Sequence, residues 1–132
     1  MKKSLKNVSL ALLPVFIFFS SCKKDSDNNG AANSRVVKYE ITGNFTGRLL
    51  VVYNDNVNGN IILNNVTLPF IKDTTYAANI TAIGIGAQAG VPGVAGQTAT
   101  MKIFSAGNVV KTVSATAGSL GELVLPAIAH TF

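Results

Sequence analysis

The stretch Thr98-Ala99-Thr100-Met101-Lys102-Ile103 alternates polar and apolar side chains along its whole length. Successive side chains of a β-strand point to opposite faces of the sheet, so this strand has one apolar and one polar face. We therefore predict a strand over Thr98–Ser105 whose apolar face enters a core. The tight connection Ala106-Gly107-Asn108 predicts that the chain returns along an antiparallel partner strand, Val109–Ala115.

The rest of the chain from Val36 onward has the same all-β character. Short runs rich in Val, Ile, Thr, Phe and Tyr are separated by Gly, Asn and Asp clusters. No stretch repeats with the period of a helix over three turns. Further strands are predicted at Val36–Thr42, Arg48–Asn54, Asn60–Val66, Thr74–Ala78, Thr81–Ala87 and Leu123–Ile128.

Seven or eight strands in about 95 residues predict an antiparallel, immunoglobulin-like β-sandwich rather than a large barrel. The run Leu49–Tyr53 is apolar at every position, so its inward and outward faces stay open. Pro126 lacks the N–H that a central strand needs, which predicts a last strand at a sheet edge. The predicted core contains Tyr39, Ile41, Val51, Met101 and Ile103.

The first 22 residues combine a basic start, an apolar run and the single cysteine of the chain. Three lysines precede the run Val8–Phe19, and Phe19-Ser20-Ser21-Cys22 follows it. This arrangement resembles the lipobox of bacterial lipoprotein signal peptides. It implies that a diacylglyceryl group is attached to the Cys22 sulfur, that residues 1–21 are removed, and that the new amino terminus is acylated. A signal peptide followed by an incidental cysteine is the alternative.

The apolar run is too short for a transmembrane anchor. Its 12 residues would span about 18 Å as a helix, against a hydrocarbon core of about 30 Å, and Pro14 interrupts it. A single cysteine also has no internal partner for a disulfide. We therefore expect a cleaved leader rather than a membrane span.

The mature chain is predicted to hold one domain behind a flexible tether. Residues 22–35 carry no large apolar side chain after the cysteine, whereas residues 36–132 contain every predicted strand. Loss of three leader lysines lowers the formal net charge from +5 to about +2. The remaining basic residues show no nucleic-acid-binding motif or patch, so no nucleic acid partner is expected.

Two acidic residues, Asp25 and Asp27, lie close behind Cys22. They resemble the acidic signals that direct some Gram-negative lipoproteins to the outer face of the outer membrane. The expected location is therefore the cell envelope, with the domain anchored to the outer membrane through acylated Cys22 on its periplasmic or surface face.

Several stretches, taken in order, resemble the MmpS-type family of small envelope domains. They are Val37–Gly43, Asn65–Phe70, Ala87-Gln88, Met101–Phe104 and Gly107–Lys111. The resemblance covers most of residues 36–117 and implies a small β domain that assists a large efflux or lipid-exporting permease. It implies an envelope transporter as a partner.

The chain also departs from that family. Phe70 stands where many relatives have Trp after Leu-Pro, the insert Gly90–Gly96 is unusually apolar for a loop, and the anchor is a lipid instead of a transmembrane helix. A shared fold is therefore better supported than a shared permease partner.

Two short motifs point to ligands, and both have simpler structural interpretations. Asn54-Asp55-Asn56-Val57-Asn58-Gly59 spaces oxygen side chains as a calcium loop does, but position twelve is Asn65 instead of Glu. A hairpin with a type I′ turn at Asn58-Gly59 is the favoured interpretation. Gly84-Ile85-Gly86 matches a loose dinucleotide motif without the required helix, so its glycines are predicted to let strands approach closely or bend. We expect no metal and no cofactor.

A third motif, Ala117-Gly118-Ser119-Leu120-Gly121, is one residue from a nucleophile elbow. Glu122 and His130 follow in the order of a hydrolase triad. The elbow requires a strand, a sharp turn and a helix on a large parallel sheet, and the sequence predicts none of that context. The chain is therefore expected not to be an enzyme, and a small serine hydrolase is the rival function.

The loop Ala89–Ala95 is the candidate binding site. Its Val91, Pro92 and Val94 have no evident reason to face water, and exposed apolar groups commonly mark interaction surfaces. We therefore expect a membrane-anchored envelope lipoprotein with a non-catalytic β-sandwich that acts as a binding or assembly accessory. A purely structural surface lipoprotein is the other alternative.

Overall fold

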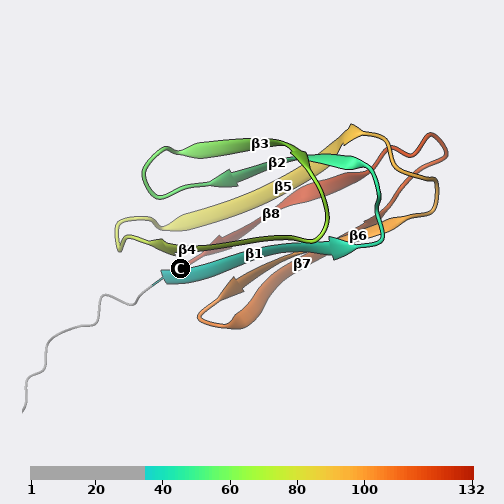
Figure 1. Cartoon of the computed structure of the whole chain (residues 1–132). Coiled ribbons are helices and arrows are strands. Elements are labelled where there is room, and N and C mark those ends of the chain that lie inside the picture. Colours follow the sequence, from blue (N-terminus) through green and yellow to red (C-terminus); the bar gives the residue numbers. More distant parts are fainter. Residues whose placement is uncertain (1–34) are drawn as a thin grey trace, which may run out of the picture.

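A computed structural model describes residues 35–132, which form eight antiparallel β-strands in two four-stranded sheets (Figure 1). One sheet has the order β4-β1-β6-β7 and the other has the order β3-β2-β5-β8. These are called sheet A and sheet B below. The predicted antiparallel β-sandwich is confirmed. The strands are β1 (Arg35–Gly43), β2 (Arg48–Asn54), β3 (Asn60–Val66), β4 (Phe70–Tyr76), β5 (Ala82–Val91), β6 (Thr98–Ser105), β7 (Asn108–Thr116) and β8 (Val124–Thr131).

The core comes mainly from the four central strands, β1 and β6 of sheet A and β2 and β5 of sheet B. Every second side chain of these strands is buried between the sheets, which is the period expected of a strand with one dry face. The strand Thr98–Ser105 has the predicted bounds, and its apolar side chains Ala99, Met101 and Ile103 enter the core as predicted. The buried central side chains are Val37, Tyr39, Ile41, Leu49, Val51, Tyr53, Ile83, Ile85, Ala87, Ala99, Met101 and Ile103.

The second four strands pass between the sheets in the same order as the first four, but they start from the opposite sheet. Strands β1 to β4 lie in sheets A, B, B and A, and strands β5 to β8 lie in sheets B, A, A and B. Each strand of the first half therefore has a counterpart in the second half on the opposite sheet. The burial patterns of β2 and β6 also coincide over seven positions. This order differs from that of an immunoglobulin constant domain, whose ABED and CFG sheets share the same two-layer architecture.

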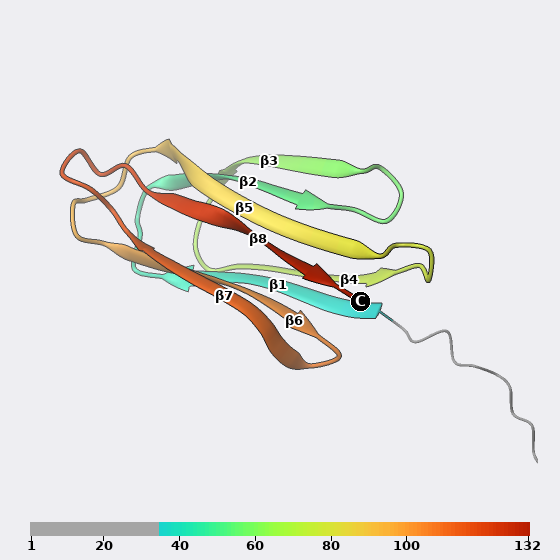
Figure 2. The same cartoon turned by 180° about the vertical axis from the view of Figure 1, so that it is seen from behind.

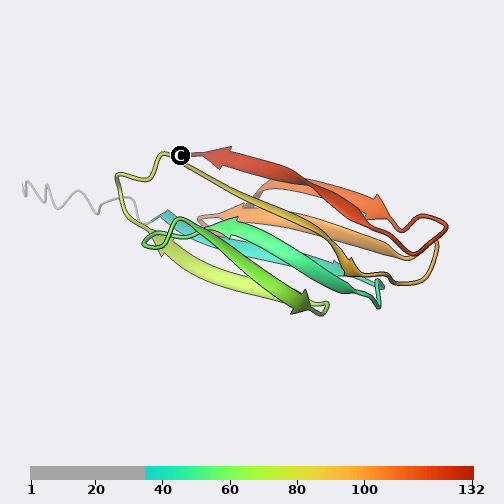
Figure 3. The ribbon, with the colours of Figure 1, turned by 90° about the horizontal axis from the view of Figure 1, so that it is seen from above.

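The two sides of the sandwich are not equivalent. Strands β7 and β8, which end the two sheets on one side, pack against each other, and Figure 2 shows them running together. Strands β3 and β4 end the sheets on the opposite side and are not packed together in this way. The view from above separates these two sides (Figure 3).

The ends of the sandwich also differ. The start of β1 and the carboxyl terminus lie at one end, called the terminal end here (Figure 1). The Arg35 guanidinium lies 4.7 Å from the ring centre of Phe132, which ties the two together. The opposite end, called the loop end, is formed by residues 44–47, 67–69, 92–97 and 117–123.

Five predicted strands have boundaries that the structure corrects. β1 gains one residue at each end, Arg35 and Gly43. β4 begins at Phe70 instead of Thr74, since charged Lys72 and Asp73 are tolerated on an exposed edge strand. β5 continues to Val91 because Ala87 and Ala89 still face the core between glycines. β8 runs to Thr131 and β7 gains one residue at each end. Pro126 lies on β8 at the edge of sheet B, as predicted.

Two tyrosines form the polar element of the core. The hydroxyl groups of Tyr39 and Tyr76 are 2.8 Å apart, and the Tyr76 hydroxyl donates to the carbonyl oxygen of Asn54. A hydroxyl group has one hydrogen to donate, and that of Tyr76 is already donated to Asn54. The Tyr39 hydroxyl is therefore the donor in the hydrogen bond between the two tyrosines. Burial raises the pKa of both tyrosines, which keeps the two hydroxyl groups neutral and able to donate.

Cutting Ile103 to Ala should lower the free energy of unfolding by roughly 2–5 kcal/mol, because the side chain is fully buried between the sheets. Ile71→Ala is the matched control, since that side chain on β4 is 56% exposed and should change stability by less than about 0.5 kcal/mol. Urea denaturation of both variants measures the difference. Equal losses would contradict the assigned faces.

Candidate binding surfaces at the loop end and on sheet B

The predicted binding residues lie at the loop end. Val91 ends β5, and Pro92 and Val94 follow in the connection to β6; all three side chains are exposed. Leu120, from the connection between β7 and β8, lies in the adjacent loop and is 83% exposed. We call these four residues the tip patch. Leu120 was not among the predicted binding residues, although an apolar side chain within a turn between two predicted strands is a sequence signal for exposure.

The two loops that carry the tip patch are held in contact by glycines. The Gly93 N–H donates to the Gly121 carbonyl oxygen at 2.9 Å. A Cβ on Gly121 would lie only 2.2 Å from the carbonyl oxygen of Gly93, and the φ angle of Gly121 is +77°. Both the backbone conformation and the close approach therefore require glycine at position 121.

A single amide side chain joins a third loop to this pair. The Oε1 atom of Gln97 accepts hydrogen bonds from the Val94 N–H at 2.9 Å and from the N–H and hydroxyl of Thr46, each at 3.0 Å. The Oδ1 atom of Asn44 in turn accepts from the Thr98 N–H at 2.7 Å. Nothing in the sequence pattern distinguished Gln97, because its role depends on which loops meet in space.

Phe45 supports these loops from below. Its side chain is buried, and a Cβ on either Gly47 or Gly93 would lie 2.5 Å from its ring. A hollow of about 380 Å³ opens beside it, between the loop of residues 44–47 and Thr67–Leu68. Because the Phe45 ring packs closely against Gly47 and Gly93, the loop that carries Pro92 and Val94 is supported from the core. This support preorganises the apolar side chains of the tip patch for binding.

The candidate hydrolase triad is not assembled within this chain. Ser119 lies in a turn at the loop end, whereas His130 pairs with Ile83 near the terminal end and packs against the Phe132 ring at 5.3 Å. A carboxylate oxygen of Glu122 accepts from the Leu120 N–H at 2.9 Å, so it stabilises its own turn. Because Ser119 precedes β8 at the loop end and His130 lies near the other end of that strand, they cannot exchange a proton directly.

The candidate calcium loop is the hairpin connection between β2 and β3. The Asp55 carboxylate accepts from the Asn58 side chain at 3.2 Å and from the backbone N–H groups of Asn56 and Val57. The side-chain hydrogen bond from Asn58 and these backbone bonds lower the pKa of Asp55. The predicted type I′ turn is wrong here, since Gly59 but not Asn58 has a positive φ. The loop closes over five residues because Asp55 organises it.

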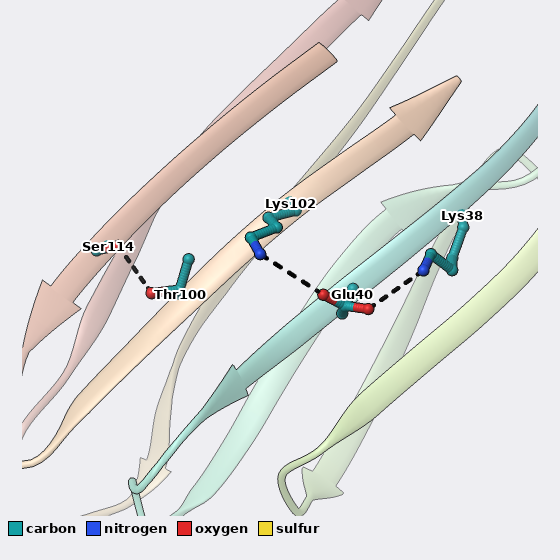
Figure 4. Close-up of polar contacts among 5 residues, drawn as sticks. All are labelled: Lys38, Glu40, Thr100, Lys102 and Ser114. Carbon is teal, nitrogen blue, oxygen red and sulfur yellow. Dashed lines mark hydrogen bonds and ion pairs between the residues drawn. The ribbon is translucent and has the colours of Figure 1, made fainter. Parts of the chain in front are cut away.

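The outer faces of the two sheets differ in charge. On sheet A, the Glu40 carboxylate forms ion pairs with the ammonium groups of Lys38 at 3.3 Å and of Lys102 at 3.9 Å (Figure 4). The hydroxyl groups of Thr100 and Ser114 form a hydrogen bond of 2.8 Å on the same sheet. The three charged side chains are half-buried at the surface, where ion pairs contribute little to stability. On sheet B, the described outward positions carry one charged side chain, Arg48.

A shallow apolar groove runs along β5 on the outer face of sheet B. One hollow of about 330 Å³ is bounded by Leu50, Val52 and Val124, and a neighbouring hollow of about 210 Å³ shares Val52 and Gly86 with it. The two glycines of the dinucleotide-like motif lie here within a strand, not in a phosphate-binding turn. A Cβ on Gly86 would approach Ala127 to 3.2 Å, so the prediction of close strand approach agrees with the structure.

Cys22, the predicted leader and the predicted tether up to residue 34 lie outside the described residues, whereas Arg35, the last residue of the predicted tether, begins β1. Within residues 35–132, no helix is long and apolar enough to cross a membrane. In the same region, no three His, Cys, Asp or Glu side chains gather as metal ligands would. No protein-family model matches the chain, and no curated protein matches it.

Replacing Gly121 with Ala should destabilise the domain by more than the roughly 1–2 kcal/mol expected for a left-handed non-glycine residue. The added methyl group would also collide with the Gly93 carbonyl. Gly96→Ala is the matched control, because Gly96 has a φ of +80° but no atom within 4 Å of its Cβ position. Denaturant unfolding compares the two variants, and an equal loss would mean that the loops do not need this contact.

Proposed function

We propose that this chain is an envelope lipoprotein, anchored through Cys22, whose β-sandwich serves as a binding or assembly accessory. The observation that carries the proposal is the tip patch, in which exposed apolar side chains are held on loops fixed by Gln97 and Gly121. Flexible loops lose conformational entropy when they bind, whereas a preorganised patch loses little. Its three neighbouring loops are joined by hydrogen bonds before any partner arrives.

The direction of the chain supports an outward-facing role for the tip patch. Any segment that precedes Arg35 enters the sandwich at the terminal end, opposite the tip patch. A flexible stretch of 12 residues has a reach on the order of 19 Å. An anchor at Cys22 would therefore leave the loop end facing away from the anchoring membrane.

The resemblance to MmpS-type domains suggests an envelope transporter as the partner class. The stretches that carry the resemblance fall on β1, on the β3–β4 connection, on β5 and on the β6–β7 hairpin. The tip patch lies mostly in the insert where this chain departs from that family. We infer that the insert supplies the binding surface that distinguishes this accessory from its relatives.

The rival functions differ in what they require. A purely structural lipoprotein needs no ordered apolar tip, and the hydrogen-bonded loop end favours the binding role. A serine hydrolase needs Ser119 near a general base, and the only histidine of the chain lies at the other end of β8. The binding accessory therefore accounts for more of the described features than either rival.

The first test concerns the anchor. Cys22→Ser should leave the precursor uncleaved or release the domain from the membrane, because acyl chains at this position would supply most of the membrane affinity. Metabolic labelling with a fatty acid and fractionation of cells measure both effects. A variant that is processed and membrane-bound like the unmodified chain would contradict the lipoprotein assignment.

The second test concerns the tip patch. Leu120→Asp should reduce recovery of crosslinked envelope partners from intact cells by about tenfold or more, since a buried unpaired carboxylate opposes an apolar interface. Val57→Asp is the matched control, because Val57 is also 83% exposed but lies in the β2–β3 loop near the terminal end.

Crosslinking followed by affinity recovery and mass spectrometry identifies the partners. Equal recovery from the Leu120 and Val57 variants would exclude the tip patch as the binding surface. Ester or peptide turnover that is abolished by Ser119→Ala would support the hydrolase instead.

A further inference from the structure

The outer edge of β3 differs from the other three sheet edges of the described domain. Natural edge strands are commonly protected from pairing by charged residues or proline. β4 carries Lys72 and Asp73, β7 carries Lys111, and β8 carries Pro126. β3 reads Asn60-Ile61-Ile62-Leu63-Asn64-Asn65-Val66 and has neither a charge nor a proline.

The hydrogen-bonding groups on this edge can be assigned from the register. The Asp55 N–H donates to the Gly59 carbonyl at 2.5 Å, and the same register pairs Tyr53 with Ile61. Bonded and non-bonded pairs alternate along an antiparallel ladder, so Ile61 and Leu63 bond to β2. The N–H and C=O groups of Asn60, Ile62 and Asn64 therefore point away from β2, toward the open side.

An independent bond on the far side of sheet B gives the same assignment. The Ala89 N–H donates to the Leu123 carbonyl at 2.7 Å. The backbone groups of the odd-numbered residues of β5 therefore point toward β8 and form hydrogen bonds with it. The even-numbered residues of β5 and β2 then bond to each other, which leaves Tyr53 and Val51 to bond with β3.

The open edge has a defined length. The β2–β3 loop precedes Asn60, and a bulge at Asn65, whose φ is 59°, interrupts the ladder after Leu63. Only the five residues from Asn60 to Asn64 therefore present a regular edge. The centre of that segment is Ile62.

We propose that this edge pairs with the same edge of a second copy of the chain, antiparallel and centred on Ile62. The segment Asn-Ile-Ile-Leu-Asn has the same chemical character when read from either end. A two-fold pairing places Asn60 opposite Asn64, Ile61 opposite Leu63, and Ile62 opposite its own counterpart. Sheet B would continue across the junction as one eight-stranded sheet.

The side chains on the outer face of sheet B around Ile62 also favour pairing with a second copy of the chain. Ile62 is 60% exposed on the outer face of sheet B. Among the described residues, the one charged side chain on that face is Arg48, which begins β2 near the loop end. Apolar side chains directly opposite one another on a sheet face stabilise the pairing, and no like charges meet across this junction. On the inner face, Ile61 and Leu63 are only half-buried and would bury their remaining surface against each other.

The size of the interface predicts a reversible dimer. A five-residue edge buries less than the ~1,200 Å² of a stable protein interface, so the dimer should form in a concentration-dependent way. The proposed lipid anchor, on which this one step rests, would raise the local concentration of the copies. The pairing itself does not depend on the tip patch or on its partner.

Sedimentation equilibrium of the full chain in density-matched detergent tests the proposal. The unmodified chain should show a monomer–dimer equilibrium, and Ile62→Lys should weaken the dimer by about tenfold or more, since it sets two like charges opposite each other. Val124→Lys is the matched control, because Val124 is also 60% exposed but lies on β8 at the other edge of sheet B.

A mixing experiment tests the self-pairing of position 62 directly. Ile62→Glu should weaken the dimer as Ile62→Lys does, and a mixture of the two variants should dimerise more tightly than either alone. Circular dichroism of each variant establishes that it is folded. A monomeric unmodified chain, equal effects of the Ile62 and Val124 changes, or no recovery in the mixture would each overturn the proposal.

Discussion

The whole sandwich depends on the burial of every second side chain of its four central strands. β1, β2, β5 and β6 together supply the twelve apolar side chains that fill the space between the sheets. Because the side-chain period of a strand is two, a slip of one residue in any of these strands would turn its apolar set to water. The register of the core therefore also fixes what faces outward, including Ile62 on β3 and the Glu40 ion pairs on β1.

Much of this arrangement could be predicted from the sequence, because alternation is a local signal. The strand Thr98–Ser105 and its return hairpin follow from polar and apolar residues at adjacent positions, and the boundaries of β2 and β3 were predicted as they stand. The run Leu49–Tyr53 could not be assigned because both of its faces are apolar. The structure shows why: Leu50 and Val52 line the half-buried groove on the outer face. β5 was predicted too short because its glycines suggested a loop.

The candidate site was predictable only in part. Exposed Val91, Pro92 and Val94 could be found from their unusual composition, but Gln97, Phe45 and Gly121 act through residues that are distant in the sequence. Leu120 joins the tip patch because the β5–β6 and β7–β8 connections meet at the loop end, which is a consequence of strand order. Single-sequence patterns report the face of a strand, but they do not report which loops become neighbours.

The domain keeps its three distinct surfaces apart. The chain enters at the terminal end, the tip patch lies at the loop end, and the uncharged β3 edge lies on the side away from β7 and β8. Antiparallel pairing through β3 would leave both tip patches exposed, at opposite ends of the extended sheet, because the two-fold axis reverses the strand direction. Two anchors at Cys22, as proposed, would then have to reach the same membrane from opposite ends of the dimer, which favours a dimer that lies with its strands along the membrane surface. In that orientation the tip patches would face sideways along the membrane, whereas in an anchored monomer the loop end would face away from it. Dimerisation would thus redirect the tip patches from partners that lie beyond the membrane surface toward proteins embedded in the anchoring membrane.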